Sequence, residues 1–275
     1  MRMKSTSPHL QSPKLMKRLF LLVTLLLTST FSIAQYKLMS QPAFKPGEQI
    51  RYTVFYNVIG IFVNAGTATF NTALTRLNNT PAYHVVAEGV TNKKYDWIFK
   101  VRDRYESYFD TEHYRSLKFY RNINEGSFKH EEEVHFNHDR KTATTGKRTY
   151  KLKNHVFDVI NAMYFARNID YDAYKVGDRI TIDMFLDNQV YNTYIEYLGK
   201  ETIKTRYGTF RAIKLRPLLI QGNIFKDADK MYLWVTDDAN HIPVRVESPI
   251  SVGSIKVDLM EYSNLKFPLE SLVSR

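Results

Sequence analysis

The feature that most constrains the fold is the series of short β-rich segments that fills almost the whole chain after residue 48. The segments are rich in Val, Ile, Thr, Tyr and Phe, and Gly, Asn, Asp or Pro separates them. No helices alternate with them, which argues against the parallel sheets of α/β proteins. The sequence therefore predicts a mainly β, antiparallel fold: a β-barrel, a half-barrel or a sandwich. The expected strands are residues 49–57, 61–70, 82–90, 101–109, 117–123, 131–137, 148–153, 179–186, 190–198, 209–219, 231–236, 242–248 and 252–261.

One segment, residues 158–167, departs from the strand pattern. Asp158 is a suitable N-cap, and Val159, Met163 and Ala166 recur at helical spacing. Asp158 and Arg167 also suit the two ends of a helix dipole. We expect one short amphipathic helix of about three turns, which covers the open mouth or one face of the sheet.

The first 34 residues have the pattern of a secretory signal peptide. Lys14, Lys17 and Arg18 precede an apolar run, Leu19–Phe31, and Ser32-Ile33-Ala34 supplies the small residues of a cleavage site. A membrane-spanning helix needs roughly 20 apolar residues, and this run is shorter. Cleavage after Ala34 is therefore favoured over an N-terminal membrane anchor.

The composition agrees with export of a protein that is neither lipidated nor disulfide-bonded, because the chain has no cysteine. Translation starts at Met1 or at Met16, and the second start gives a more ordinary leader. Residues 35–275 are long enough to bury a sizeable core and are predicted to form a single β domain. No later segment is apolar enough to span a bilayer. We expect a soluble exported protein, located in the periplasm.

The net charge changes when the leader is removed. The whole chain has a net charge of +11. Cleavage of the leader removes five basic residues and no acidic residue, which leaves 34 basic against 28 acidic residues, a net charge of +6. Such a balance suits ordinary solubility or contact with anionic envelope polymers and lipid headgroups. The basic residues are scattered among acids, so nucleic acid is not an expected partner.

No recognisable catalytic or cofactor motif is present. Cysteine is absent, and so are the Gly-x-Ser-x-Gly elbow, phosphate loops and dinucleotide fingerprints. Three histidines lie close in sequence, but strand alternation turns His135 away from His130 and His138. The latter two are eight residues apart, roughly 26 Å along a strand, so one strand cannot bring both to one ion. We therefore predict no catalytic residue, no cofactor and no metal site.

The densest polar region covers residues 101–108 and 119–126. On a strand, Arg102 and Arg104 share one face, whereas Asp103 lies on the other with Tyr105 and Ser107. Arg121 can pair with them if the two strands are neighbours. The region is either a cross-strand ion network or the polar end of a ligand cavity. The residues predicted to bind a ligand are Arg102, Asp103, Arg104 and Arg121, with Tyr95, Trp97, Phe99 and Trp234 as aromatic residues at the cavity mouth.

Several longer strings together resemble a known family. They are residues 97–108 (WIFKVRDRYESY), 122–126 (NINEG), 158–167 (DVINAMYFAR), 233–243 (LWVTDDANHIP) and 252–256 (VGSIK). They are similar to the domain-of-unknown-function 3108 family of exported bacterial proteins, in its Bacteroidetes-like form, from about Phe44 to Leu265. The resemblance implies an antiparallel β-barrel-like fold in the cell envelope and supplies no catalytic residues. The hairpin of residues 232–246 is also similar to hairpins in periplasmic lipoprotein carriers.

Three functions agree with these observations. The first is a non-enzymatic envelope protein that holds an apolar or amphiphilic ligand, such as a lipid, a lipoprotein acyl chain or a glycan, in the barrel concavity. The second is a structural or assembly factor that contacts other envelope proteins through exposed strand edges. The third is a polysaccharide hydrolase that uses acids among Asp103, Glu106, Glu125 and Asp237. Hydrolysis would need two carboxylates that converge in a cleft, one of them with a raised pKa.

Overall fold

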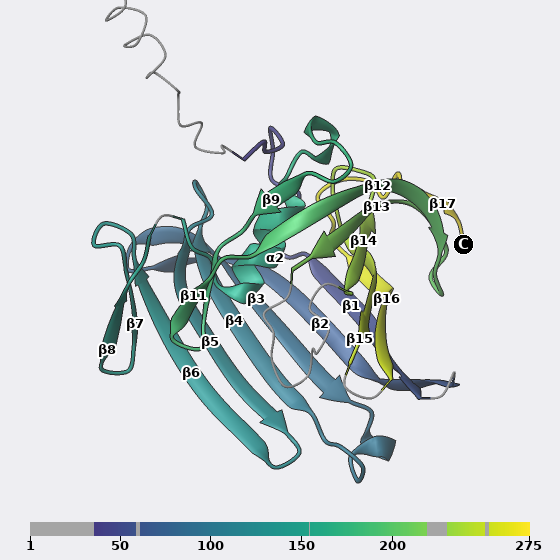
Figure 1. Cartoon of the computed structure of the whole chain (residues 1–275), viewed down its shortest axis with the longest axis horizontal. Coiled ribbons are helices and arrows are strands. Elements are labelled where there is room, and N and C mark those ends of the chain that lie inside the picture. The colour runs from purple at the N-terminus through teal and green to yellow at the C-terminus, as the bar shows by residue number, and fades with distance from the viewer. Residues whose placement is uncertain (1–35, 59–60, 154, 219–229, 251–252) are drawn as a thin grey trace, which may run out of the picture. The chain divides into compact units, whose positions relative to one another are not determined.

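The computed structural model describes residues 36–58, 61–153, 155–218, 230–250 and 253–275, so the predicted signal peptide and its cleavage site lie outside the described residues. Residues 37–275 form one compact unit (Figure 1). Most of this unit is antiparallel β-sheet, which confirms the mainly β prediction. Within the described ranges, no helix is long and apolar enough to cross a membrane.

In the described ranges, the elements follow one another as a long series of strands with one short α-helix. The first eight strands are β1 (Gln49–Val58), β2 (Ile61–Leu77), β3 (Thr80–Thr91), β4 (Arg102–Asp110), β5 (Ser116–Glu125), β6 (Phe128–Asn137), β7 (Thr142–Thr145) and β8 (Arg148–Lys151). The others are β9 (Arg179–Thr181), β10 (Met184–Leu186), β11 (Gln189–Tyr191), β12 (Tyr194–Lys204), β13 (Thr209–Pro217), β14 (Tyr232–Thr236), β15 (Pro243–Pro249), β16 (Ser254–Ser263) and β17 (Leu272–Ser274). The helices are α2 (Val159–Arg167) and the 3-10 turns η1 (Lys93–Tyr95) and η2 (Tyr171–Ala173).

One large sheet contains nearly all of these strands, in the order β8-β7-β6-β5-β4-β3-β2-β1-β16-β15-β14-β13-β12-β9, with β17 paired to β13. The hairpin β10–β11 is separate. In the part of the chain that the structure describes, no ladder joins β8 to β9, so the sheet stays open. It curves around α2, as Figure 1 shows, and is therefore a half-barrel rather than a closed barrel.

The helix lies where the sequence predicted it, but Met163 of the expected apolar stripe is exposed, because the helix is turned to pack through Ile160 and Tyr164. The Asp158 carboxylate caps its first turn by accepting from the backbone N–H groups of Ile160 (3.1 Å) and Asn161 (2.9 Å). Ile160 and Tyr164 pack in the main core with buried side chains of β3 to β7, among them Phe109. We call the sheet face that packs against α2 the inner face.

Alternation along the strands decides which polar side chains reach the inner face. Phe109, Phe119 and Val134 belong to the core that contains α2. Side chains two, four or six residues away on β4, β5 and β6 share that face. The inner face therefore continues from this core toward the end of the sheet that carries η1 and the β5–β6 turn, which we call the η1 end.

Two of the expected strands divide in the structure, and an additional strand lies between two others. Residues 190–198 were expected to form one strand, but they divide between β11, which pairs with β10, and β12, which pairs with β9 and β13. Residues 179–186 were expected to form one strand, but they divide into β9, which pairs with β12, and β10, which pairs with β11. The backbone changes partner at this point, because Asp183 accepts from the N–H of Phe157 and Phe185 donates to the Phe157 carbonyl. Residues 142–145, which lie between two of the expected strands, form the additional strand β7, and it pairs with both β6 and β8.

Candidate functional site

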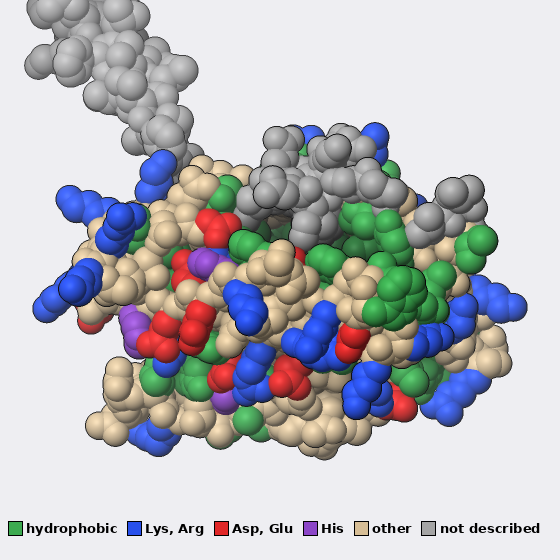
Figure 2. Space-filling view, turned by 90° about the horizontal axis from the view of Figure 1, so that it is seen from below, with side chains coloured by type: hydrophobic (Ala, Val, Ile, Leu, Met, Phe, Trp, Pro, Cys, Tyr) green, Lys and Arg blue, Asp and Glu red, His purple; other side chains and the backbone are tan. Residues whose placement is uncertain are grey.

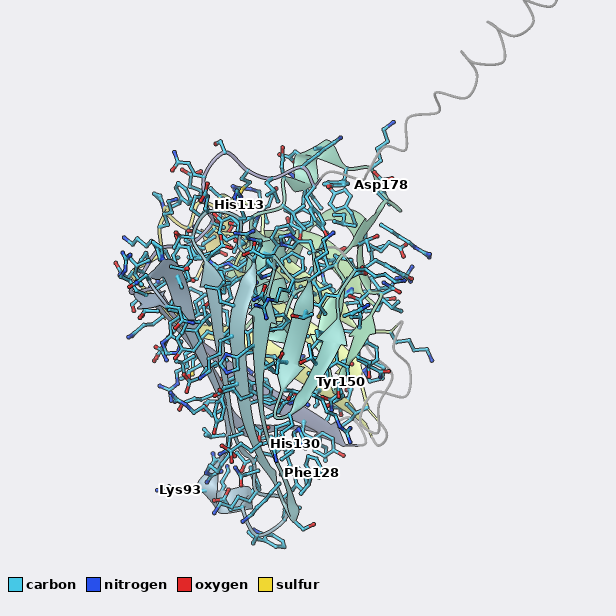
Figure 3. The ribbon with its side chains drawn as sticks, turned by 90° about the vertical axis from the view of Figure 1, so that its left-hand side faces the viewer. Lys93, His113, Phe128, His130, Tyr150 and Asp178 are labelled. Atoms are coloured by element: carbon cyan, nitrogen blue, oxygen red, sulfur yellow. The ribbon has the colours of Figure 1, made fainter. Side chains whose placement is uncertain are left out.

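Polar side chains gather on the inner face toward the η1 end. They come from three adjacent strands, β4, β5 and β6, and from the β10–β11 turn. The register places Tyr105 opposite Arg121 and Arg121 opposite Glu132. Figure 3 shows His130 near this end of the ribbon, with Phe128 beyond it. We call this group the inner-face polar cluster; its members are Asp103, Tyr105, Arg121, Glu125, His130, Glu132 and Asp187.

Arg121 is the centre of the cluster. Its Nη2 lies 2.7 Å from the Glu132 carboxylate and 3.2 Å from Nε2 of His130, and it also donates to Asp187. Arg121 and Glu132 are both buried, so each charge depends on the other for compensation. The Nε of Arg121 has no hydrogen-bond acceptor among the described residues. The guanidinium therefore retains a free donor inside the cluster.

Three members of the cluster have the geometry of metal ligands. One ligand atom from each of His130, Glu132 and Asp187 lies within 4.8 Å of the others. However, Nη2 of Arg121 contacts all three groups, so a guanidinium already supplies the positive charge between them. These residues fit an arginine-centred network better than a metal centre. The sequence pattern could not predict that Asp187 belongs to the cluster, because this residue lies in a turn 55 residues after Glu132 in the chain.

Two carboxyl groups of the cluster meet directly. Asp103 accepts from the backbone N–H of Asn124 (2.9 Å) and forms a side-chain hydrogen bond with Glu125. Burial, followed by the charge of Asp103 and this hydrogen bond, raises the pKa of Glu125 above its ordinary value. Burial likewise raises the pKa of Tyr105 to about 12, so its hydroxyl is a neutral donor at neutral pH. Glu125 therefore keeps its proton to a higher pH than an ordinary glutamate does.

The other two acids proposed for hydrolysis lie elsewhere. Glu106 faces the opposite side of β4, where it contacts Arg104 (2.8 Å) and His84 (2.8 Å). Asp237 forms an ion pair with Lys200 at 2.8 Å. Of the four acids named from the sequence, only Asp103 and Glu125 converge.

The four predicted charged binding residues divide between the two faces of the sheet. Asp103 and Arg121 belong to the inner-face polar cluster. Arg104 lies on the other face and pairs with Glu88 (2.6 Å) and Glu106, while Arg102 pairs with Asp96 of the β3–β4 connection (2.6 Å). The structure therefore has an ion ladder on the outer face and a polar cluster on the inner face, and the ligand cavity stays a prediction.

The predicted aromatic residues also separate. Tyr95, Trp97 and Phe99 lie together in or after η1, and Trp97 and Phe99 are exposed. Trp234 is buried in a second core with Ile50 and Tyr52, and its Nε1 donates to Glu201 (2.6 Å). The structure therefore does not bring Trp234 to the other three. Binding by these eight residues stays a prediction.

Two grooves lie elsewhere on the described surface. One, of about 450 Å³, is lined by residues of β1, β2, β16 and the β12–β13 turn, including Phe55, Arg206 and Tyr207. The other, of about 360 Å³, lies across β1, β2 and β14–β16 and includes Phe62 and Lys256. Their volumes are in the range of small-ligand sites. None of the eight predicted residues lines either groove.

The chain belongs to the family described as "Protein of unknown function (DUF3108)", whose profile matches residues 51–260. This confirms the resemblance inferred from the sequence. No curated protein matches the chain.

Two solved structures are similar to this one. A β-barrel-like protein of the DUF1849 family from Brucella abortus superposes with a TM-score of 0.52 at 10% identity, over 80% of this chain and 98% of its own. A protein of Parabacteroides distasonis, provisionally called a lipoprotein, aligns with a TM-score of 0.35 at 14% identity, over 83% of this chain and 100% of its own. The Brucella structure supports the β-barrel-like fold alone.

Proposed function

We propose that this chain is an exported, non-enzymatic protein of the bacterial cell envelope that binds the polar part of an amphiphilic lipid or glycan on the inner face of its open sheet. The observation that carries the proposal is the inner-face polar cluster, where charges of both signs meet toward the η1 end and where Tyr105, Glu125 and Asp187 are partly exposed. Residence in the periplasm after cleavage at Ala34 belongs to the same proposal and is supported by the leader pattern.

The packing of the inner face favours a polar ligand over an acyl chain. Away from the η1 end, α2 and the strands of the β10–β11 hairpin cover this face, and the turn of the hairpin reaches the polar cluster through Asp187. Phe119, Val134, Phe136 and Phe185 are buried there and pack in one core. Protein interiors of this kind leave few voids, so a long acyl chain has no apolar lumen to enter. The acyl part of an amphiphile would stay outside the sheet.

The chemistry of the cluster suits a ligand rich in hydroxyl groups. Tyr105 is a partly exposed donor, whereas Glu125 and Asp187 are partly exposed acceptors. Sugar hydroxyls both donate and accept, so they can use both kinds of group. Carboxyl groups outnumber cations in the cluster, which disfavours a purely anionic headgroup.

The edges of the sheet give less support to an assembly factor that acts by strand addition. The edge strands β8 and β9 have four and three residues, and both carry basic side chains. Short, charged edges are the usual means by which proteins prevent pairing with another strand.

The proposal predicts a ligand that co-purifies with the protein. Native mass spectrometry of protein isolated from its own envelope should show an added mass, which tandem spectrometry would assign to a lipid or glycan. Tyr105→Phe with Glu125→Gln should release it, because these side chains are the partly exposed donor and acceptor of β4 and β5. Arg104→Gln, on the opposite face of β4, is the matched control and should retain it. A ligand-free wild-type protein, or equal retention in both variants, would contradict the proposal.

A second candidate, polysaccharide hydrolysis, is favoured by one observation: the raised pKa of Glu125 beside Asp103. Glycosidase carboxyl groups stand roughly 5–9.5 Å apart, so a directly hydrogen-bonded pair leaves no room for a glycosidic bond between them. Carboxyl pairs that share a proton can instead activate water. Release of new reducing ends from envelope polysaccharide by the wild type, abolished in Asp103→Asn, would support hydrolysis.

A further inference from the structure

Apolar side chains are exposed at the η1 end, where the chain turns from β3 into β4 and from β5 into β6. Trp97 is 82% exposed, Ile98 63%, Phe99 52% and Phe128 56%. We call these four residues the apolar tip. The described ranges contain thirteen exposed large apolar residues, and seven of them lie at this end of the strands. These seven are the four residues of the tip together with Ile61, Phe62 and Val90. Clustered exposure of this kind marks an interaction surface.

The tip is held in place by hydrogen bonds from its own backbone. The N–H groups of Ile98 and Phe99 both donate to the Tyr95 carbonyl, at 2.9 and 3.1 Å. The N–H of Gly126 in the β5–β6 turn donates to the Lys100 carbonyl (2.7 Å), which joins the two connections. The apolar side chains are therefore presented outward by an ordered backbone, and little further ordering is needed when they are covered.

The groups around η1 also fix the tip to the sheet. Asp96 accepts from Oγ1 of Thr91 (2.8 Å) and from Arg102 (2.6 Å). The Thr91 hydrogen bond and the nearby cations keep the pKa of Asp96 below its ordinary value, so it stays an anion bound to Arg102. Arg102 forms the ion pair with this acid, and Lys100 lies near enough to contribute to the shift without pairing with it.

The tip is bordered by lysines. Lys93, Lys94, Lys100 and Lys129 are all exposed, and no ion pair joins any of them to an acid in the described part of the chain. In the view of this end, Lys and Arg side chains border the hydrophobic ones (Figure 2), and Figure 3 shows Lys93 and Phe128 at the same extremity of the ribbon. The lysines thus give the rim of the tip a positive charge.

We propose that the apolar tip and its lysine rim form a membrane-docking surface, which inserts Trp97, Ile98, Phe99 and Phe128 into the interface of a bilayer that contains anionic phospholipid. Tryptophan and phenylalanine suit the headgroup boundary, and each lysine near an anionic surface adds to the attraction. The tip projects from the turns of the sheet, and a deformable bilayer can cover a projecting apolar surface without a preformed groove. This surface is separate from the inner-face polar cluster, so docking can be tested whether or not the cluster binds a ligand.

The test is flotation of the processed protein with vesicles of phosphatidylcholine that contain phosphatidylglycerol, compared with vesicles of phosphatidylcholine alone. We expect binding to the anionic vesicles and a blue shift of tryptophan emission. The shift reports on Trp97, because Trp234, the second of two tryptophans, is only 7% exposed. Trp97→Ala with Phe99→Ala should weaken binding at least about tenfold, and Lys93→Gln with Lys100→Gln about 30-fold.

A control at the other end of the molecule separates docking from general stickiness. Lys175→Gln with Val176→Ala removes one exposed lysine and one exposed apolar side chain near Asp178, which Figure 3 places opposite Lys93. This variant should bind like the wild type. All these side chains are exposed, so the variants should fold, and circular dichroism checks this. No wild-type binding, equal binding to neutral vesicles, or tip variants that bind like the control would each overturn the proposal.

Discussion

The guanidinium of Arg167 makes two hydrogen bonds with the carboxylate of Glu48, Nη1 to Oε1 at 2.6 Å and Nη2 to Oε2 at 2.9 Å, and both side chains are buried. Its Nε donates to the Asn240 carbonyl (3.1 Å). The last turn of α2 is thereby joined to the segment before β1 and to the turn before β15. A bidentate pair of this geometry fixes the helix on the inner face as well as compensating two charges.

Breaking this pair should strongly destabilise the fold. Glu48→Gln leaves the Arg167 charge buried without its counter-charge, and we expect a loss of about 3–5 kcal/mol in the free energy of unfolding. Urea denaturation measures the change. Glu261→Gln is the matched control, because it removes an exposed pair with Arg51 at 3.5 Å, and it should cost less than about 1 kcal/mol. Equal costs for the two variants would show that the Arg167 pair has no special role.

The N-cap of α2 should make stability depend on pH. Burial raises the pKa of Asp158 to about 6, although hydrogen bonds from Asn161, Ser116, Ser107 and Ile160 oppose the rise. A raised pKa in the folded state stabilises the fold below about pH 4, and this contribution is lost as pH rises through about 6. The total loss is about 3 kcal/mol.

Asp158→Asn tests this directly, since asparagine also caps helices but does not titrate. The difference in unfolding free energy between this variant and the wild type should change between pH 4 and pH 6.5, with the variant relatively more stable at the higher pH. Urea titrations across this range measure it. Other carboxyl groups titrate in both proteins, so they cancel in the difference. A difference that does not vary with pH would contradict the prediction.

The sequence predicted more of the fold than of the candidate site. Strand alternation correctly put Asp103 on the face opposite Arg102 and Arg104, and helical spacing located residues 158–167, because both patterns are local. Asp187 reaches Arg121 through a long-range contact across the inner face, and no local pattern encodes such a contact. Trp234 looked like a partner for Trp97 because both are aromatic, yet the order of the strands separates β14 from β4.

The raised pKa of Glu125 in the inner-face polar cluster should be measurable by NMR. The charge of Asp103 contributes to the raised pKa of Glu125, so Asp103→Asn should move that pKa back toward the ordinary glutamate value. Carbon-13 titration of the Glu125 carboxyl group measures the shift. Glu88→Gln, which removes a carboxylate on the opposite side of the sheet, should leave the Glu125 titration unchanged. If both variants leave it unchanged, burial alone raises the pKa.

Gly126 contacts the apolar tip and Gly146 does not, but the two have almost the same backbone conformation. Alanine substitutions at these positions can therefore distinguish the cost of backbone strain from the cost of crowding against Phe99. Gly126 has φ +58° and Gly146 has φ +54°, and both lie in hairpin turns. A Cβ at Gly146 would meet no atom within 4 Å, whereas one at Gly126 would lie 3.1 Å from the Phe99 ring. Gly146→Ala should therefore cost about 1–2 kcal/mol through backbone strain alone. Gly126→Ala should cost more, because Phe99 must also move.

The extra cost of Gly126→Ala should vanish when Phe99 is replaced by alanine as well. A double-mutant cycle of Gly126→Ala and Phe99→Ala, read by urea denaturation, measures this coupling. The same cycle with Gly146→Ala should give no coupling, since no contact joins that turn to Phe99. If Gly126→Ala and Gly146→Ala cost the same in the wild-type background, the Phe99 ring yields freely and the tip is less rigidly ordered than its hydrogen bonds imply.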